Sequence, residues 1–235
     1  MANPKLFRAI DKAVKDYAMI SDGDRILLAA SGGKDSTALA DYLSFRKKRT
    51  DFFIQAMHIS TEMENAQLDA IETLFCRWKI PLYTLKISIK NRLKQGQKMN
   101  CYWCSTQRRT ELIKYALDNG FTKIAFGHHL DDILETALMN IFTKERLVGM
   151  PPILKLEKFP ITIIRPLALA DIATIKQHVH ERSYASYTCT CPYQSNSHRK
   201  LARTRLEALT GGSYVLKIKL FNALKQQNIV SDYLH

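Results

Sequence analysis

The stretch RILLAASGGKDSTALADYLSF, residues 25–45, decides the fold. Its first six residues have the length and apolar character of a buried strand, and residues 37–45 carry apolar side chains at helical spacing. The block SGGKDS lies between them. A Gly-Gly pair between a strand and a helix lets the backbone turn tightly and point its N–H groups at an anion, which the helix dipole also attracts. The expected anion-binding residues are Ser31, Gly32, Gly33, Lys34, Asp35 and Ser36.

The SGGKDS block is not the common phosphate-binding loop, because the Gly-Lys-Ser/Thr ending of the Walker pattern is absent. It resembles instead the PP-loop of the ATP pyrophosphatases, SGGxDS, at every fixed position. This resemblance implies that the loop binds ATP, which is cleaved between its α- and β-phosphates to transfer AMP to a substrate oxygen. Asp35 would organise the Mg²⁺ that accompanies the nucleotide.

Strands and helices are expected to alternate along most of the chain. The expected strands are residues 25–30, 52–59, 82–87 and 123–126, and the expected helices are residues 4–17, 34–46, 64–79, 102–119 and 131–142. This alternation predicts an α/β fold with a doubly wound parallel sheet. Residues 153–159 and 161–165 read as a short antiparallel pair. We expect a nucleotide-binding domain with an inserted CxxC at 1–150, and at 151–235 the end of the sheet with a small basic helical C-terminal extension.

Polar residues follow three of the predicted strands. SGGKDS follows the first, His58 lies near the end of the second, and Gly127 opens the motif GHHLDDILET at residues 127–136. Ligands of open α/β sheets bind beyond the carboxyl ends of the strands. We therefore expect His58 and Gly127 to join the loop in binding ATP.

The acidic residues of the second motif crowd the first turn of an expected helix, where the dipole favours them. Asp131 is a candidate N-cap. Asp132 and Glu135 are three residues apart, so they can share a helix face and, with Asp35, hold Mg²⁺ against the triphosphate. Asp35 and Asp132 are candidate catalytic residues, whereas the motif's two histidines fit packing as well as function.

The cysteines suit metal or redox chemistry better than a disulfide framework. Cys101 and Cys104 form a CxxC at the start of an expected helix, a pattern used by zinc, redox and iron–sulfur sites alike. Cys189 and Cys191 lie far downstream, and their one-residue spacing is poor for zinc. Cys76 falls on an apolar helical face and is expected in the core.

Four patterns together resemble the tRNA 2-thiocytidine synthetase family: SGGKDS, CYWCSTQRR at 101–109, GHHxDDxxET, and CPYQSNSHR at 191–199. The resemblance implies a 4Fe–4S cluster on Cys101, Cys104 and Cys191, with the first two also catalytic. It further implies tRNA as substrate, a sulfur donor (a cysteine desulfurase or sulfide) and a homodimer. The implied reaction adenylates the C2 oxygen of the cytidine at tRNA position 32 and replaces it with sulfur delivered through the cluster. The role of Cys189 stays open.

The formal net charge of +13 independently favours a polyanionic partner. Basic residues concentrate at 86–123 and 199–225, and the candidate RNA-binding residues are Lys94, Lys98, Arg108, Arg109 and Arg199. No apolar run reaches membrane-spanning length and the N-terminus is not signal-like, so we expect no membrane partner and a cytoplasmic protein.

Two other classes stay open at this level. One is a PP-loop tRNA-modifying ligase of the lysidine or 2-thiouridine type, with zinc on the cysteines. The other is a non-catalytic tRNA-binding protein that has kept the loop.

Overall fold

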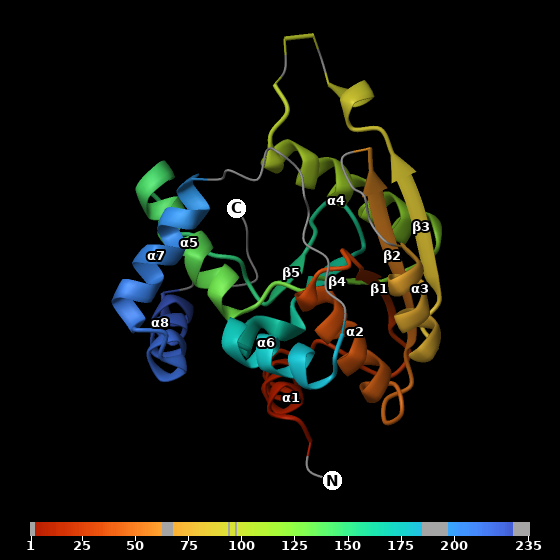
Figure 1. The fold of residues 1–235 in the computed structure, drawn as a ribbon, viewed down its shortest axis with the longest axis horizontal. Coiled ribbons are helices and arrows are strands. Elements are labelled where there is room, and N and C mark those ends of the chain that lie inside the picture. The colour runs from red at the N-terminus through yellow and green to blue at the C-terminus, as the bar shows by residue number, and fades with distance from the viewer. Residues whose placement is uncertain (1–2, 63–67, 94, 97, 185–196, 228–235) are drawn as a thin grey trace.

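The structure, a computed structural model, describes residues 3–62, 68–93, 95–96, 98–184 and 197–227. Its strands form one six-stranded sheet in the order β3-β2-β1-β4-β6-β5 (Figure 1). Their bounds are β1 Arg25–Ala29, β2 Phe53–Thr61, β3 Leu82–Ile87, β4 Lys123–Ala125, β5 Ile153–Lys155 and β6 Thr162–Ile164. Neighbouring strands are parallel except β5, which runs antiparallel to β6. The predicted parallel sheet and its short antiparallel pair are both confirmed.

The helices follow the predicted alternation. They are α1 Lys5–Asp16, α2 Lys34–Arg46, α3 Leu68–Arg77, α4 Cys101–Asp118, α5 Leu130–Lys144, α6 Ile172–Glu181, α7 Ser197–Thr210 and α8 Tyr214–Gln226, with short 3-10 helices η1 Lys90–Arg92 and η2 Pro166–Leu169. The predicted helix at 34–46 and strand at 82–87 match to the residue. The first residues of the helix predicted at 64–79 lie outside the described residues.

Two hydrophobic cores lie on opposite faces of the sheet. Ile26 and Leu28 of β1 join the core shared with α1, α2, α5 and α6, whereas Leu27 between them joins the core under α4. This alternation follows from the period of two along a strand. The sheet is thus covered on both faces, as predicted.

Cys76 departs from its expected place in the core. The described part of α3 turns Ile71 and Phe75 inward, four residues apart on one stripe, and the adjacent Cys76 is left exposed. The apolar residues around Cys76 in the sequence suggested a wider buried face of α3 than the structure has.

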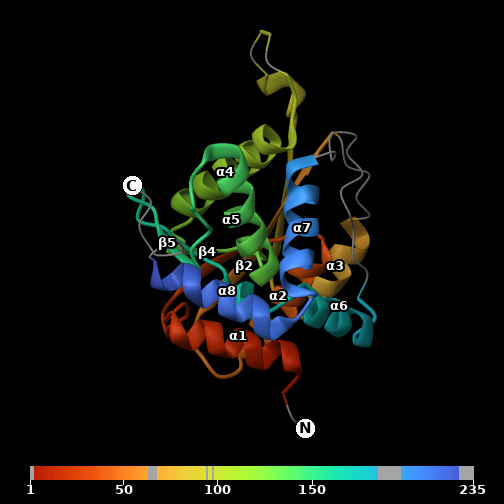
Figure 2. The same ribbon diagram turned by 90° about the vertical axis from the view of Figure 1, so that its left-hand side faces the viewer.

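The C-terminal helices α7 and α8 pack against α5, beyond the β5 side of the sheet (Figures 1 and 2). This arrangement brings the last basic segment of the chain beside the helix that begins within the GHHLDDILET motif. None of the helices in the described residues is both long and apolar enough to cross a membrane.

Candidate active site

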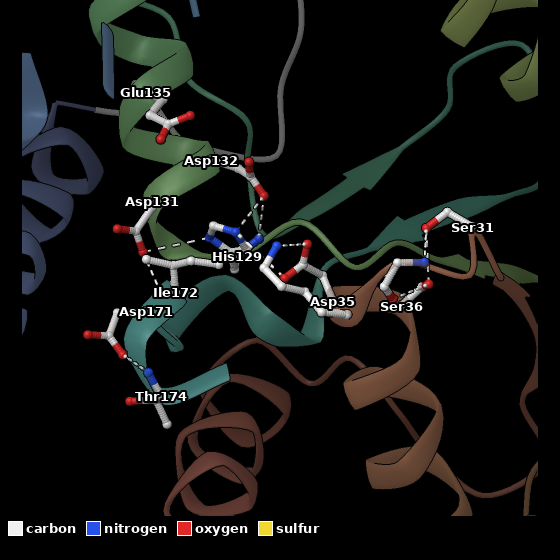
Figure 3. A network of polar contacts seen from close by, with 12 residues as sticks. Ser31, Asp35, Ser36, His129, Asp131, Asp132, Glu135, Asp171, Ile172 and Thr174 are labelled. Carbon is white, nitrogen blue, oxygen red and sulfur yellow. Dashed lines mark hydrogen bonds and ion pairs between the residues drawn. The ribbon is translucent and has the colours of Figure 1, made fainter. Parts of the chain in front are cut away.

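The SGGKDS loop leads directly from β1 into α2, which begins at Lys34. Gly32 has φ +76°, a left-handed conformation that favours glycine. The two serines close the loop, with their Oγ atoms 3.0 Å apart and Ser36 Oγ donating to the Gly33 carbonyl at 3.0 Å (Figure 3). The two serines thus hold the turn before α2, and its N-cap residue Gly33 makes no side-chain capping hydrogen bond, which suits an anion at the N-terminal N–H groups.

A pocket of about 290 Å³ opens between this loop and α4. Its floor comes from the ends of the central strands, and its rim includes charged side chains from the loop, α4 and α5. The lining residues used below are Ser31, Asp35, Ser36, Arg108, Arg109, Gly127, His128 and Asp132. The pocket lies at the carboxyl edge of the parallel strands, where the sheet topology places ligands.

His58 is not among the residues that line this pocket, so the geometry gives no support to the prediction that it binds the nucleotide. Met57 and Ile59 of β2 line the pocket, and His58 between them points to the opposite face of the sheet. Its Nδ1 lies 2.8 Å from the carbonyl oxygen of Ala30. His58 therefore supports the backbone just before the loop.

Gly127 packs directly against the loop. A Cβ atom at this position would lie 3.0 Å from the backbone nitrogen of Ser36 and 3.1 Å from the carbonyl carbon of Asp35. Both neighbours are backbone atoms, so they cannot swing aside. A side chain here would displace the loop, and glycine keeps the two motifs in contact.

His129 joins the two motifs through carboxylates. The buried imidazole lies among three of them, as Figure 3 shows. Its Nε2 is 3.9 Å from Asp35 Oδ1 and 3.3 Å from Asp132 Oδ2, and its Nδ1 is 3.6 Å from Asp131 Oδ2. The loop and the first turn of α5 thus form one polar cluster.

The three acidic residues of α5 each pair with a basic residue of the C-terminal helices. The pairs are Asp131 with Lys217 at 2.7 Å, Asp132 with Arg199 at 3.3 Å and Glu135 with Arg203 at 2.8 Å. Lys217 and Asp131 are both almost fully buried. We call these contacts the α5 ion pairs.

The prediction that Asp132 and Glu135 hold Mg²⁺ together with Asp35 stays a prediction. In this structure each of the two α5 carboxylates already has an arginine beside it, Arg199 and Arg203 respectively. Asp131 is not the N-cap of α5. His129 takes that place, and its backbone N–H donates to Asp132 Oδ2 at 3.1 Å.

Asp35 and Asp132 nevertheless both line the pocket. Burial alone would raise the pKa of Asp132, but the nearby imidazoles and Arg199 bring it below its usual value. Asp35 Oδ2 accepts from Lys34 Nζ at 3.0 Å. Its Oδ1 is buried and receives no hydrogen bond within the described residues. A buried carboxylate oxygen without a donor suits a bound cation.

The helix α4 carries both the cysteine pair and the pocket arginines. Asn100 caps it by accepting from the Trp103 N–H at 2.8 Å. Cys101 and Cys104 occupy the first turn, partly exposed and not joined in a disulfide. Arg108 and Arg109, one to two turns further on, line the pocket. Cys191 and Cys189 lie outside the described residues.

The remaining basic residues of the prediction lie in different places. Lys98 is exposed ahead of α4, Arg199 pairs with Asp132, and Lys94 lies outside the described residues.

The 3-10 helix η1 projects beyond the end of β3 (Figure 1). Glu62 holds its first turn by accepting the N–H groups of Ile89 and Lys90 at 2.9 and 2.7 Å.

Three basic residues of the site were not predicted from the sequence. Arg165 follows β6 and donates to the Pro151 carbonyl at 2.5 Å, and burial lowers its pKa to about 10. The position of Arg165 directly after a strand could have identified it as a site residue. Arg203 could have been identified by its spacing of four residues from Arg199, which puts both on one helix face. Lys217 had no comparable signal, because its partner lies 86 residues earlier.

Comparison with known proteins identifies the family. A family model described as a PP-loop domain matches residues 2–209. The tRNA-cytidine(32) 2-sulfurtransferase of Polynucleobacter asymbioticus is 34% identical over 86% of this chain and 69% of its own length. That of Deinococcus radiodurans is 35% identical over 86% of this chain and 70% of its own.

The fold is also seen in a solved structure, the U34-tRNA thiolase NcsA of Methanococcus maripaludis with its 4Fe–4S cluster. It has a TM-score of 0.79 at 18% identity, covering 95% of this chain and 78% of that protein. The solved structure shows the likeness of the fold, and the family model and the sequence relatives show the family. The chain therefore belongs to the PP-loop family and, within it, to the tRNA-cytidine(32) 2-sulfurtransferases.

Proposed function

We propose that this protein is an ATP-dependent tRNA sulfurtransferase that adenylates the C2 oxygen of the cytidine at tRNA position 32 and replaces it with sulfur. One observation carries the proposal beyond family membership. The helix α4 presents Cys101 and Cys104 in its first turn and Arg108 and Arg109 in the wall of the loop pocket. This arrangement supports the proposal, because one helix would connect the sulfur chemistry with the nucleotide chemistry.

The loop end of the pocket suits the phosphates. The N–H groups at the start of α2 and the charge of Lys34 favour the β- and γ-phosphates, and Asp35 Oδ1 would hold Mg²⁺. The C2 oxygen of cytosine attacks the α-phosphorus; a new P–O bond forms, the bond to the β-phosphate breaks, and pyrophosphate leaves. Positive charge from Arg108 and Arg109 stabilises the charge on the phosphorus oxygens.

The second half of the reaction exchanges the activated oxygen for sulfur. Sulfur at the oxidation level of sulfide attacks C2; the C2–O bond then breaks, AMP leaves, the sulfur loses its proton, and a thiocarbonyl remains. Sulfide as donor supplies this nucleophile directly, and a cysteine desulfurase supplies it once a thiol reductant has cleaved the S–S bond of its persulfide. Cytosine reaches the pocket readily because loop bases of RNA are already unpaired or easily splayed out.

The cysteines fit an iron–sulfur cluster. Two thiols three residues apart on one helical turn, partly exposed and outside a disulfide, are a suitable donor pair. We propose Cys101, Cys104 and Cys191 as the three ligands. When bound, the cluster would supply an iron site able to carry sulfur.

The tRNA backbone is proposed to contact the basic surface near α4, including Lys98, together with Arg199 and Lys94. We also propose a cytoplasmic location, which a tRNA substrate supports. We also propose a homodimer, supported by exposed apolar side chains of the outer helices, among them Phe142, Leu209 and Val215. In this scheme residues 1–150 act as the nucleotide-binding domain, and residues 151–235 supply the third cysteine and basic helices.

Mass analysis of tRNA nucleosides from cells lacking this protein tests the proposal. We expect 2-thiocytidine to disappear, to return with the wild-type gene and with Lys12→Ala, and to stay absent with Asp35→Ala. Lys12 is exposed and remote from the pocket, which makes it the matched control. Unchanged 2-thiocytidine in the deletion strain would overturn the proposal. A colourless protein with stoichiometric zinc after anaerobic purification would favour a zinc-dependent ligase instead.

A further inference from the structure

His128 is a pocket residue whose role the adenylation scheme leaves open. Its ring stacks on Phe126, with the centroids 5.5 Å apart and the planes 23° apart, and it lines the pocket. Its Nδ1 lies 3.4 Å from Nε of Arg165. Arg165 is itself buried at the end of β6 and held by the Pro151 carbonyl, so the ring has a fixed neighbour.

The neighbour determines which imidazole nitrogen carries the proton. An arginine guanidinium has only donors, so the Nδ1 that faces it must offer a lone pair. The proton of a neutral ring then lies on Nε2, across the ring. Burial and the charge of Arg165 lower the pKa of His128 to about 3, which agrees with a neutral ring. His128 lines the pocket, where an Nε2–H can donate to a bound ligand.

The position of His128 indicates which group of a bound nucleotide would accept its Nε2–H. Gly127, the preceding residue, packs on the backbone of Asp35 and Ser36, where the loop would hold the β- and γ-phosphates. The α-phosphate connects those phosphates to the nucleoside, so it is the group nearest to a pocket residue beside the loop.

We propose that His128 binds the nucleotide as an uncharged donor, giving its Nε2–H to an oxygen of the ATP α-phosphate, with Arg165 as the positioning residue that fixes this tautomer. The inference rests on the proposed function in that ATP occupies the loop pocket. A neutral imidazole donates one hydrogen bond to the α-phosphate and, unlike an imidazolium, has no second, acidic N–H beside the reacting phosphorus.

Long-range ¹H–¹⁵N spectra of the ¹⁵N-labelled protein test the tautomer without any activity. The His128 signals are assigned among the seven histidines by their loss in His128→Gln. We expect the Nε2–H form in the wild type and a mixture of both forms in Arg165→Met, which keeps the side-chain length but has no N–H. The Nδ1–H form in the wild type would overturn the proposal, whether or not Arg165→Met folds.

Calorimetric binding of an ATP analogue with a methylene bridge between its α- and β-phosphorus atoms tests the contact. We expect His128→Leu to weaken binding roughly tenfold, and His128→Gln, which keeps an uncharged N–H, to stay near the wild type. The control His180→Leu changes an exposed histidine of α6. Unchanged affinity in His128→Leu refutes the inference alone, whereas a wild type that binds no analogue refutes the proposed function.

Discussion

Replacing Lys217 with methionine should destabilise the protein strongly, because it removes one partner of a buried ion pair. Lys217 Nζ lies 2.7 Å from Asp131 Oδ1, and the two side chains are 4% and 6% exposed. Asp131 would remain as a buried carboxylate, with the N–H of Ile172 at 2.8 Å as its remaining donor. Breaking such a pair costs about 3–5 kcal/mol. At about 2–4 °C per kcal/mol for a chain of this size, the melting temperature should fall by about 6–20 °C.

Thermal and urea denaturation of matched variants measures this effect. Lys12→Met breaks the pair with Asp16 at 2.6 Å, whose side chains are 65% and 38% exposed, so it should cost about 1 kcal/mol or less. Adding Asp131→Asn to Lys217→Met removes the unpaired charge and should recover about 1–3 kcal/mol. If Lys217→Met costs no more than Lys12→Met, the reasoning from burial is wrong.

Three further changes test other parts of the site. Gly127→Ala should cost about 1–3 kcal/mol of stability and lower nucleotide affinity by about tenfold or more, since its Cβ would push the loop backbone; calorimetry would contradict this if affinity is unchanged. Burial would raise the pKa of Glu62, but the N–H groups of Lys90 and Ile89 that it accepts bring the pKa below its usual value. The stabilisation of the folded state by Glu62 is therefore fully present above its unfolded pKa of about 4.3 and is lost as pH falls through the folded pKa. The amide NMR shifts of those residues should follow this acid titration, and Glu62→Gln should abolish it; persistence in the variant would assign it elsewhere. Cys101→Ala should abolish the visible absorption of anaerobically purified protein, whereas the exposed Cys76→Ala should keep it; equal spectra would remove Cys101 as a ligand.

Local patterns were sufficient for most of the fold. The apolar run at 25–30 and the Gly-Gly turn predicted the central strand and the loop, because both signals lie within a few residues. His58 was expected near the end of a strand at 52–59, yet β2 continues to Thr61, so His58 lies within the strand, where successive side chains point to opposite faces of the sheet.

The partners of the acidic cluster were harder to predict. Asp132 and Glu135 resemble metal ligands until the arginines 67 and 68 residues later are placed beside them. Charge pairing over such distances depends on how α7 docks on α5, and no local pattern reports that docking. The sequence motif indicated where the acidic residues gather, whereas the basic residues paired with them became evident only in three dimensions.

The α5 ion pairs also determine when during synthesis the protein can be completed. A ribosome makes the loop and α5 long before Arg199, Arg203 and Lys217, which lie 67 to 86 residues beyond their partners. Until those residues emerge, the start of α5 keeps acidic groups that have no basic partner, and burying them is costly. The nascent chain can form its central strands early, but the polar cluster beside the loop closes only when the last helices have been translated.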